Sequence, residues 1–245
     1  MENAQLVGLA RQATLARQMD LIANNLANIN TNGFKGQKLV FKEERMPGAA
    51  DNSFLRPDRP ISFVVDDQNL VDFTPGYTQE TGNPLDLAIN GKGWFSVQTP
   101  NGTRYTRNGS FTVNDQGQLV NQNNYPVLTD SGPITFAKNE TNVTIAQDGT
   151  ISTRNGVKGK VQVVDFDEKQ PPIKVGETLY SGQNATPILQ PEITQGRLEK
   201  SNVNGVVEMT NMINVQRSYQ AVAAMMKQTD DLRKSAISSL GQVNA

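Results

Sequence analysis

Neither cysteine nor histidine occurs in this sequence of 245 residues. The chain therefore cannot build a Ser-His-Asp or Cys-His catalytic set, a disulfide or a zinc-finger site. The formal net charge is −1, which disfavours a nucleic-acid binder because such proteins present a basic surface to phosphate. No run approaches 18 consecutive apolar residues, so we expect no membrane-spanning helix. These absences direct attention from catalytic sites to surfaces.

The first 30 residues carry an apolar stripe with helical spacing. Its members recur at alternating steps of four and three residues: Leu15, Met19, Ile22, Leu26 and Ile29. The same spacing continues upstream, after an offset of three residues: Leu6, Leu9, Ala13 and Ala16. Such spacing is typical of a coiled-coil seam. We expect the helix to stop near residues 30–33, where Gly33 suits a left-handed cap.

The last 40 residues repeat this character. A second seam alternates steps of three and four: Met212, Val215, Tyr219, Val222 and Met226. Asn202 or Asn204 is placed to cap the start of this helix, and Glu208 complements the dipole of its first turns. We therefore predict a second long amphipathic helix over roughly residues 204–240.

The two seams need partners, since an amphipathic helix alone in water is marginal. The helices can pair within one chain, or each can pair with helices of neighbouring subunits. Further apolar residues lie outside the seams: Ala10, Ala23, Ala27, Val207, Met209, Ile213 and Met225. This extra apolar surface suits more than one neighbour and favours assembly.

The middle of the chain is rich in turns and reads as β-structure. Residues 94–97 and 102–106 flank an Asn-Gly turn, and residues 111–113 and 119–120 flank another turn. Strands are also predicted at residues 61–65, 143–145, 150–153 and 160–164. The expected fold is α+β, with terminal helices forming a coiled-coil-like pair and an inserted all-β domain. We expect a discontinuous helical assembly domain (1–35 with 200–245), an extended linker with a short strand (36–80) and a β-rich outer domain (81–199).

Several stretches, in order along most of the chain, resemble the bacterial flagellar rod and hook protein family. Residues 23–35 are similar to its N-terminal signature, ANNLANINTNGFK, and residues 81–97 to the start of its β domain. Residues 105–111 and 125–128 fit the same domain, and residues 196–204 and 208–219 resemble its C-terminal helix and the segment before it. Length excludes the longer hook protein and the short rod proteins. Residues 1–12 and 61–66 favour the proximal-rod type, with the distal-rod type as the alternative.

The resemblance implies a structural subunit of the flagellar basal body, in the rod that crosses the periplasm. Such proteins are exported through the flagellum's own secretion channel, and their terminal helices pack as an inner tube. The expected partners are copies of this chain, other flagellar rod subunits and the flagellar export apparatus. We expect no nucleic acid, no membrane insertion, no small-molecule substrate, no cofactor and no metal, and the chain is predicted not to be an enzyme.

The predicted assembly interface combines the seams with asparagines near the end of the first helix: Leu15, Met19, Ile22, Asn25, Leu26, Asn28, Ile29, Met212, Val215, Tyr219, Val222 and Met226. One alternative is a β-rich binding module that its helices merely dimerise. Another is a peptidoglycan hydrolase, which needs two carboxylates at a set separation. Asp66 and Asp67 are poor partners because neighbouring residues of a strand point to opposite faces, and Asp165 and Asp167 flank a turn.

Overall fold

The computed structural model describes residues 2–46, 61–137, 140, 143–167 and 169–242. The chain forms two compact units. Unit 1 comprises Met1–Ala27, Gln37–Leu70 and Asn204–Ala245, and unit 2 comprises Asn28–Gly36 and Val71–Val203. Helices at both ends of the chain pack together, and the middle is rich in strands, so the predicted α+β class is confirmed.

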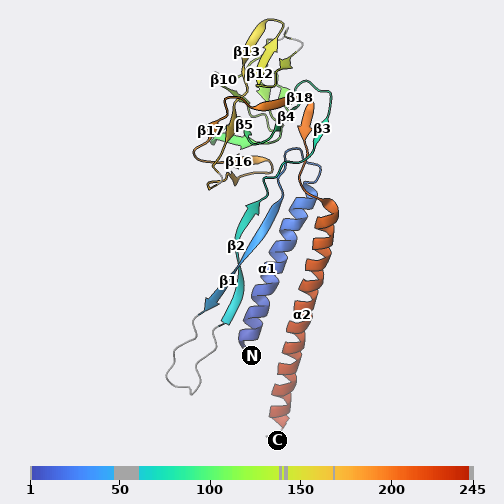
Figure 1. The fold of residues 1–245 in the computed structure, drawn as a ribbon. Coiled ribbons are helices and arrows are strands. Elements are labelled where there is room, and N and C mark those ends of the chain that lie inside the picture. The colour runs from blue at the N-terminus through green and yellow to red at the C-terminus, as the bar shows by residue number, and fades with distance from the viewer. Residues whose placement is uncertain (1, 47–60, 138–139, 141–142, 168, 243–245) are drawn as a thin grey trace. The chain divides into compact units, whose positions relative to one another are not determined.

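In the described part of unit 1, the regular structure consists of two helices and two strands. Helix α1 spans Glu2–Ala27 and helix α2 spans Gly205–Gln242, and the two lie side by side (Figure 1). The predicted cap of the second helix is Asn204, whose Oδ1 accepts hydrogen bonds from the backbone N–H groups of Val206 and Val207 at 3.1 and 3.3 Å. Strands β1 (Gln37–Met46) and β2 (Ile61–Val71) pair with each other, and β1 contacts α1.

Unit 2 is built on one six-stranded sheet, with strand order β15-β16-β6-β5-β14-β17. The strands are β5 (Trp94–Thr99), β6 (Gly102–Thr106), β14 (Val163–Asp165), β15 (Ile173–Lys174), β16 (Leu179–Ser181) and β17 (Thr186–Pro187). Strands β5 and β6 form the predicted hairpin, in which Thr99 pairs with Gly102. Gly102 has a φ of 97°, a conformation that glycine adopts without strain.

The remaining strands of unit 2 form small antiparallel sheets. They are β3 (Thr78–Glu80) with β19 (Arg197–Glu199), β4 (Leu87–Asn90) with β18 (Glu192–Gln195), β7 (Thr112–Val113) with β8 (Leu119–Val120), β9 (Leu128–Thr129) with β10 (Gly132–Pro133), and β11 (Thr144–Ile145) with β12 (Thr150–Thr153) and β13 (Gly156–Lys160). The prediction of one continuous strand over residues 160–164 is wrong. Lys160 ends β13, whereas Val163 begins β14 in the six-stranded sheet, so the chain changes sheets between them.

Alternate residues of β5 pack into two hydrophobic clusters, as the two-residue repeat of a strand requires. Phe95 and Val97 belong to the larger cluster, in which the rings of Phe95 and Phe111 meet edge to face with centroids 5.3 Å apart. Trp94 belongs to the smaller cluster and packs on Tyr180 at 4.6 Å between ring centroids. Both faces of the central strand are therefore buried, which gives unit 2 a core of its own.

Candidate assembly surfaces

The predicted seams meet each other along the α1–α2 pair of unit 1. Ile22, Val215 and Val222 are the members that the pair buries, with 4, 7 and 8% of their surface exposed. The other seam members on the two helices are half-buried: Leu15, Met19, Leu26, Met212, Tyr219 and Met226. The buried strip of the pair is thus thin, because most seam residues keep part of their surface open.

The register of the pair is set at the start of α1. A Cβ on Gly8 would lie 3.3 Å from Cγ of Met226, so the missing side chain lets the two helices approach closely. Nearby, Gln5 Nε2 donates to Asp230 Oδ1 at 2.6 Å, and Arg233 donates to Gln5 Oε1 at 2.5 Å. Gly8 and Gln5, and not the predicted upstream stripe, therefore face α2.

The upstream stripe of α1 points away from α2. Leu6 and Leu9 are 54 and 61% exposed. They belong to a larger set of exposed apolar side chains on the two helices: Leu6, Leu9, Val206, Val207, Met209, Ile213, Met225, Leu232, Ile237 and Leu240. We call this set the outer apolar face. It includes four of the residues that the sequence placed outside the seams, namely Val207, Met209, Ile213 and Met225.

Asn25 is 2% exposed and holds the chain that follows α1. Its Nδ2 donates to the carbonyl oxygen of Gln37 at 2.8 Å, and its Oδ1 accepts the N–H of Gln37 at 3.0 Å. Nδ2 also reaches Glu208 Oε1 on α2 at 3.4 Å. One amide thus ties both helices to the first residue of β1.

Asn28 and Ile29 lie beyond the last residue of α1, in unit 2, and both are half-buried. The carbonyl oxygen of Asn28 accepts the N–H of Thr31 at 3.1 Å, which closes a turn. Helix α1 ends at Ala27, before the predicted stop at residues 30–33, so the prediction that Gly33 caps the helix is wrong. Gly33 does have a positive φ, 68°, and a Cβ there would lie 2.3 Å from the backbone nitrogen of Asn108. Only glycine fits this close approach of two backbones.

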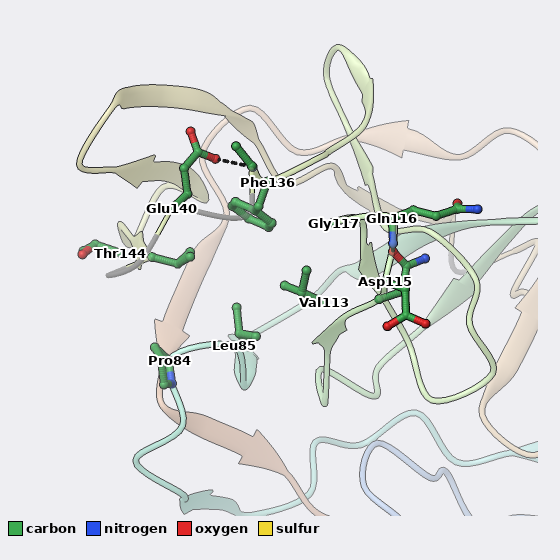
Figure 2. A pocket seen from close by; sticks show the side chains of 12 residues that line it. Pro84, Leu85, Val113, Asp115, Gln116, Gly117, Phe136, Glu140 and Thr144 are labelled. Atoms are coloured by element: carbon green, nitrogen blue, oxygen red, sulfur yellow. Dashed lines mark hydrogen bonds between the residues drawn. The ribbon is translucent and has the colours of Figure 1, made fainter.

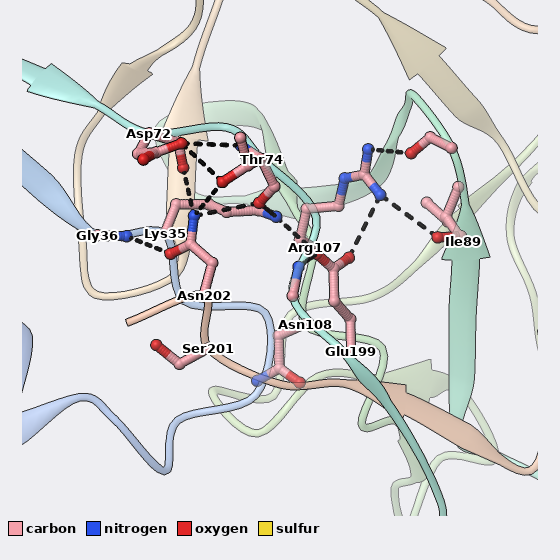
Figure 3. Close-up of polar contacts among 12 residues, drawn as sticks. Lys35, Gly36, Asp72, Thr74, Ile89, Arg107, Asn108, Glu199, Ser201 and Asn202 are labelled. Carbon is pink, nitrogen blue, oxygen red and sulfur yellow. Dashed lines mark hydrogen bonds and ion pairs between the residues drawn. The ribbon is translucent and has the colours of Figure 1, made fainter. Parts of the chain in front are cut away.

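Unit 2 contains a buried ionic cluster, which we call the junction cluster: Lys35, Arg107 and Glu199 (Figure 3). Glu199 Oε1 lies 2.5 Å from Lys35 Nζ and accepts the N–H of Gly76 at 3.0 Å. Its Oε2 accepts from Arg107 at 3.3 Å. No more than 5% of any of the three side chains is exposed. Burial lowers the pKa of both Lys35 and Arg107, and the charge of Glu199 opposes that shift.

The junction cluster joins the segment that follows α1 to the segment that precedes α2. The N–H of Gly33 donates to the carbonyl oxygen of Glu199 at 2.7 Å, and Lys200 Nζ donates to Asn32 Oδ1 at 2.9 Å. The N–H of Gly36 donates to Asn202 Oδ1 at 2.8 Å. Within unit 2, the two ends of the inserted chain are therefore fastened to each other. Neither the periodicity nor the motifs of the sequence predicted this arrangement.

The described carboxylates beside the cavity of unit 2 lack the features of a hydrolytic pair. A cavity of about 900 Å³ in unit 2 is lined by Leu85, Val113 and Phe136, with Asp115 and Glu140 at its edge (Figure 2). Hydrogen bonds, chiefly from Lys158, lower the pKa of Glu140, whereas a general acid needs a raised pKa. The side chains of Asp66 and Asp67 lie outside the described residues.

Asp165 and Asp167, which flank a turn, accept hydrogen bonds from nearby backbone N–H groups. Asp165 Oδ1 accepts the N–H of Phe166, and Asp167 Oδ1 accepts the N–H of Lys169 at 3.0 Å. Among the residues that the structure describes, no three acidic side chains gather to hold a metal ion. Within the same residues, no helix has the length and apolar character needed to cross a membrane.

Comparisons with known proteins place this arrangement in a family. Residues 6–35 match "Flagella basal body rod protein", residues 88–153 match "Flagellar hook protein FlgE/F/G D1 domain", and residues 194–239 match "Flagellar basal body rod FlgEFG protein C-terminal". The flagellar basal-body rod protein FlgF of Caulobacter vibrioides is 42% identical, with 100% of each chain covered. FlgF of Mesorhizobium japonicum is 34% identical, over 98% of this chain and 99% of its own.

The distal-rod alternative has weaker support. The flagellar basal-body rod protein FlgG of Buchnera aphidicola from Acyrthosiphon pisum is 33% identical, over 87% of this chain and 90% of its own. FlgG of Bacillus subtilis is 30% identical, over 94 and 96%. The resemblance seen in the sequence is thus confirmed over the full length. The chain belongs to the family of flagellar basal-body rod proteins, as a structural subunit of the FlgF type and not an enzyme.

Proposed function

We propose that the α1–α2 pair is the assembling element of this subunit, and that it joins copies of this chain and other rod subunits into the proximal rod. The seams hold the pair together within one chain. The outer apolar face then makes the contacts between subunits, together with the open flanks of half-buried seam residues such as Leu15, Met19 and Tyr219.

The observation that supports this proposal is that apolar side chains stay exposed on the two helices after the helices have paired. Val206, Met209 and Ile213 lie one helical turn apart on α2 and are 71, 50 and 50% exposed. Burying a large aliphatic side chain stabilises an interface by roughly 1.5–3 kcal/mol, so a few such residues offset much of the cost of association. A helix pair that stayed monomeric would leave this surface in water.

Export precedes assembly in this proposal. The resemblance to exported flagellar proteins implies passage of the unfolded chain through the flagellar export apparatus. The lack of cysteine agrees with that route, since an unfolded chain without thiols forms no disulfide in an oxidising space. The helices pair and the outer apolar face forms only after release.

The experiment replaces Met209 and Ile213 by Asp in a strain that lacks the native gene. Both residues are half exposed, so we expect a folded, exported subunit that does not enter the rod, and cells that do not swim. Gln216→Asp together with Gln220→Asp is the matched control, because both residues are exposed on the same helix. Normal swimming and rod incorporation of the Met209/Ile213 variant would contradict the proposal.

A further inference from the structure

Helix α2 continues past the start of α1. It has 38 residues, against 26 in α1. Gln5, near the start of α1, contacts Asp230 and Arg233, so the residues after Arg233 extend beyond the shorter helix. At 1.5 Å per residue, the segment 234–242 adds roughly 13 Å. We call this segment the overhang.

The overhang prolongs the seam of α2. Ile237 and Leu240 follow Arg233 by four and seven residues, so all three lie on one helical face, the face that meets α1 further up the helix. Ile237 is 71% and Leu240 is 69% exposed. The overhang thus presents a continuation of an existing helix–helix interface that α1 of the same chain does not cover.

The other unused seam of unit 1 is on α1. Leu6, Leu9, Ala13 and Ala16 keep the three-four spacing of a seam. Leu6, Leu9 and Ala13 are exposed, because α1 turns its Gly8 face to Met226. The small side chains of Ala13 and Ala16 allow a second helix to approach closely. This stripe has the length and spacing that two turns of a helix require.

We infer that the overhang of one subunit is seated on the Leu6–Leu9–Ala13 stripe of α1 in a second copy of this chain. The inference deepens the proposed function and rests on it. Within one chain, Leu9 and Leu240 are separated along the helix axes by roughly 16 Å, from the residues that separate them from the Gln5–Arg233 contact. The contact is therefore intermolecular.

In this contact the overhang is antiparallel to the α1 that it meets, as α2 is to α1 within one chain. The two copies then point in the same direction, so the contact does not close a two-fold dimer. The overhang of the second copy remains open and accepts a third. Each addition uses the same pair of surfaces, and the chain of contacts runs in one direction. Polar growth of an assembly from identical subunits follows from this head-to-tail geometry.

Disulfide mapping tests the contact, because the chain has no cysteine of its own. Leu9→Cys and Leu240→Cys are introduced into one chain, and basal bodies isolated from cells making it are oxidised. A disulfide needs Cα atoms within about 7 Å, so no bond can form inside one subunit. We expect bands of two or more covalently joined copies. Leu9→Cys with Ser238→Cys is the control, since Ser238 points to another face of the overhang.

Cells that make two single-cysteine chains test whether the two surfaces come from different copies. Cells that make two chains, one with only Leu9→Cys and the other with only Leu240→Cys, should yield a mixed dimer, whereas neither chain alone should cross-link. A rod that contains the double variant but forms no disulfide would overturn the contact and leave the proposed function standing.

A second measurement needs no disulfide. Ile237→Asp with Leu240→Asp should reduce incorporation into the rod at least about tenfold, because two apolar side chains lose their burial. Ser238→Asp with Ser239→Asp places the same charges on other faces of the same turns and should incorporate normally. Equal incorporation of the two variants would overturn the inference. Loss of incorporation in both would show that charge, and not the seam, controls the step, and would overturn it as well.

Discussion

The ammonium of Lys35 lies 2.5 Å from the carboxylate of Glu199, although 164 residues separate them in the sequence. Both side chains are almost completely buried, and Arg107 shares the same carboxylate. One acid thus compensates two buried cations. Because Lys35 follows α1 and Glu199 precedes α2, this contact fixes the ends of the insert that separates the two helices.

Replacing Glu199 by Gln should destabilise unit 2 by about 3–5 kcal/mol, since Lys35 and Arg107 would remain buried without their counter-charge. Trp94 is the only tryptophan, and the guanidinium of Arg107 lies 5.5 Å from its ring, so its fluorescence in urea follows this unit. The control is Glu192→Gln at an exposed position, which should unfold like the native chain. Equal midpoints for the two variants would contradict this account of the cluster.

Replacing Asn25 by Ala should lower the stability of the helix pair by about 1–3 kcal/mol. The change removes the two hydrogen bonds that the Asn25 amide makes with the backbone of Gln37, a half-buried residue. Thermal unfolding followed by helical circular dichroism measures the loss. Asn30→Ala lies in the same sequence run but at an exposed position, and it should have an effect within about 0.5 kcal/mol.

Gly8 should reject a large side chain. In Gly8→Leu the new Cβ would meet Met226, and the rest of the side chain would push α1 and α2 apart. We expect faster amide exchange in both helices than in the native chain. Ala23→Leu adds similar bulk at an exposed position of α1 and should leave exchange unchanged. Unaltered exchange in Gly8→Leu would show that the helices do not need this close approach.

Because of Lys174, the free energy of unfolding of unit 2 should increase as the pH rises. Burial lowers the pKa of Lys174 from 10.5 to about 8, although its ammonium lies 4.0 Å from the ring centroid of Phe34. Between these two pH values the unfolded chain holds the proton that the folded chain has released, so raising the pH favours folding. The difference in unfolding free energy between the native chain and Lys174→Gln should therefore increase from pH 7 to pH 10. A constant difference would place the amine in water.

The overhang should exchange its amide protons faster than the paired part of α2. Ile237 and Leu240 of the overhang are exposed, whereas Val215 and Val222 are buried. Incorporation into the rod should slow exchange across the overhang. Hydrogen exchange on the free subunit and on isolated basal bodies measures both states. Equal protection of residues 215–222 and 234–242 in the free subunit would contradict the view that the overhang is unpaired.

Much of the fold follows from local sequence signals. The seams predict two long helices, Asn204 predicts where the second begins, and the Asn101-Gly102 pair predicts the β5–β6 hairpin. These signals are local, because capping and turn geometry depend on a few neighbouring residues. The prediction of one strand over residues 160–164 was wrong because the chain changes sheets there. A run of β-forming residues does not indicate which sheet it joins.

The surfaces were harder to predict than the elements. The spacing of Leu6 and Leu9 fits a seam, but the contact of Gly8 with Met226 decides which face of α1 meets α2. The junction cluster joins residues from distant parts of the chain, and a charged residue gives no local signal of its partner. The one available hint was that Lys35 and Glu199 each lie in a run that resembles the family.

The backbone hydrogen bond between Gly33 and Glu199 holds the two ends of unit 2 together. Residues between them can be lengthened, shortened or exchanged without moving the points at which the chain leaves one helix and approaches the other. A pair of helices can thereby carry inserts of very different size.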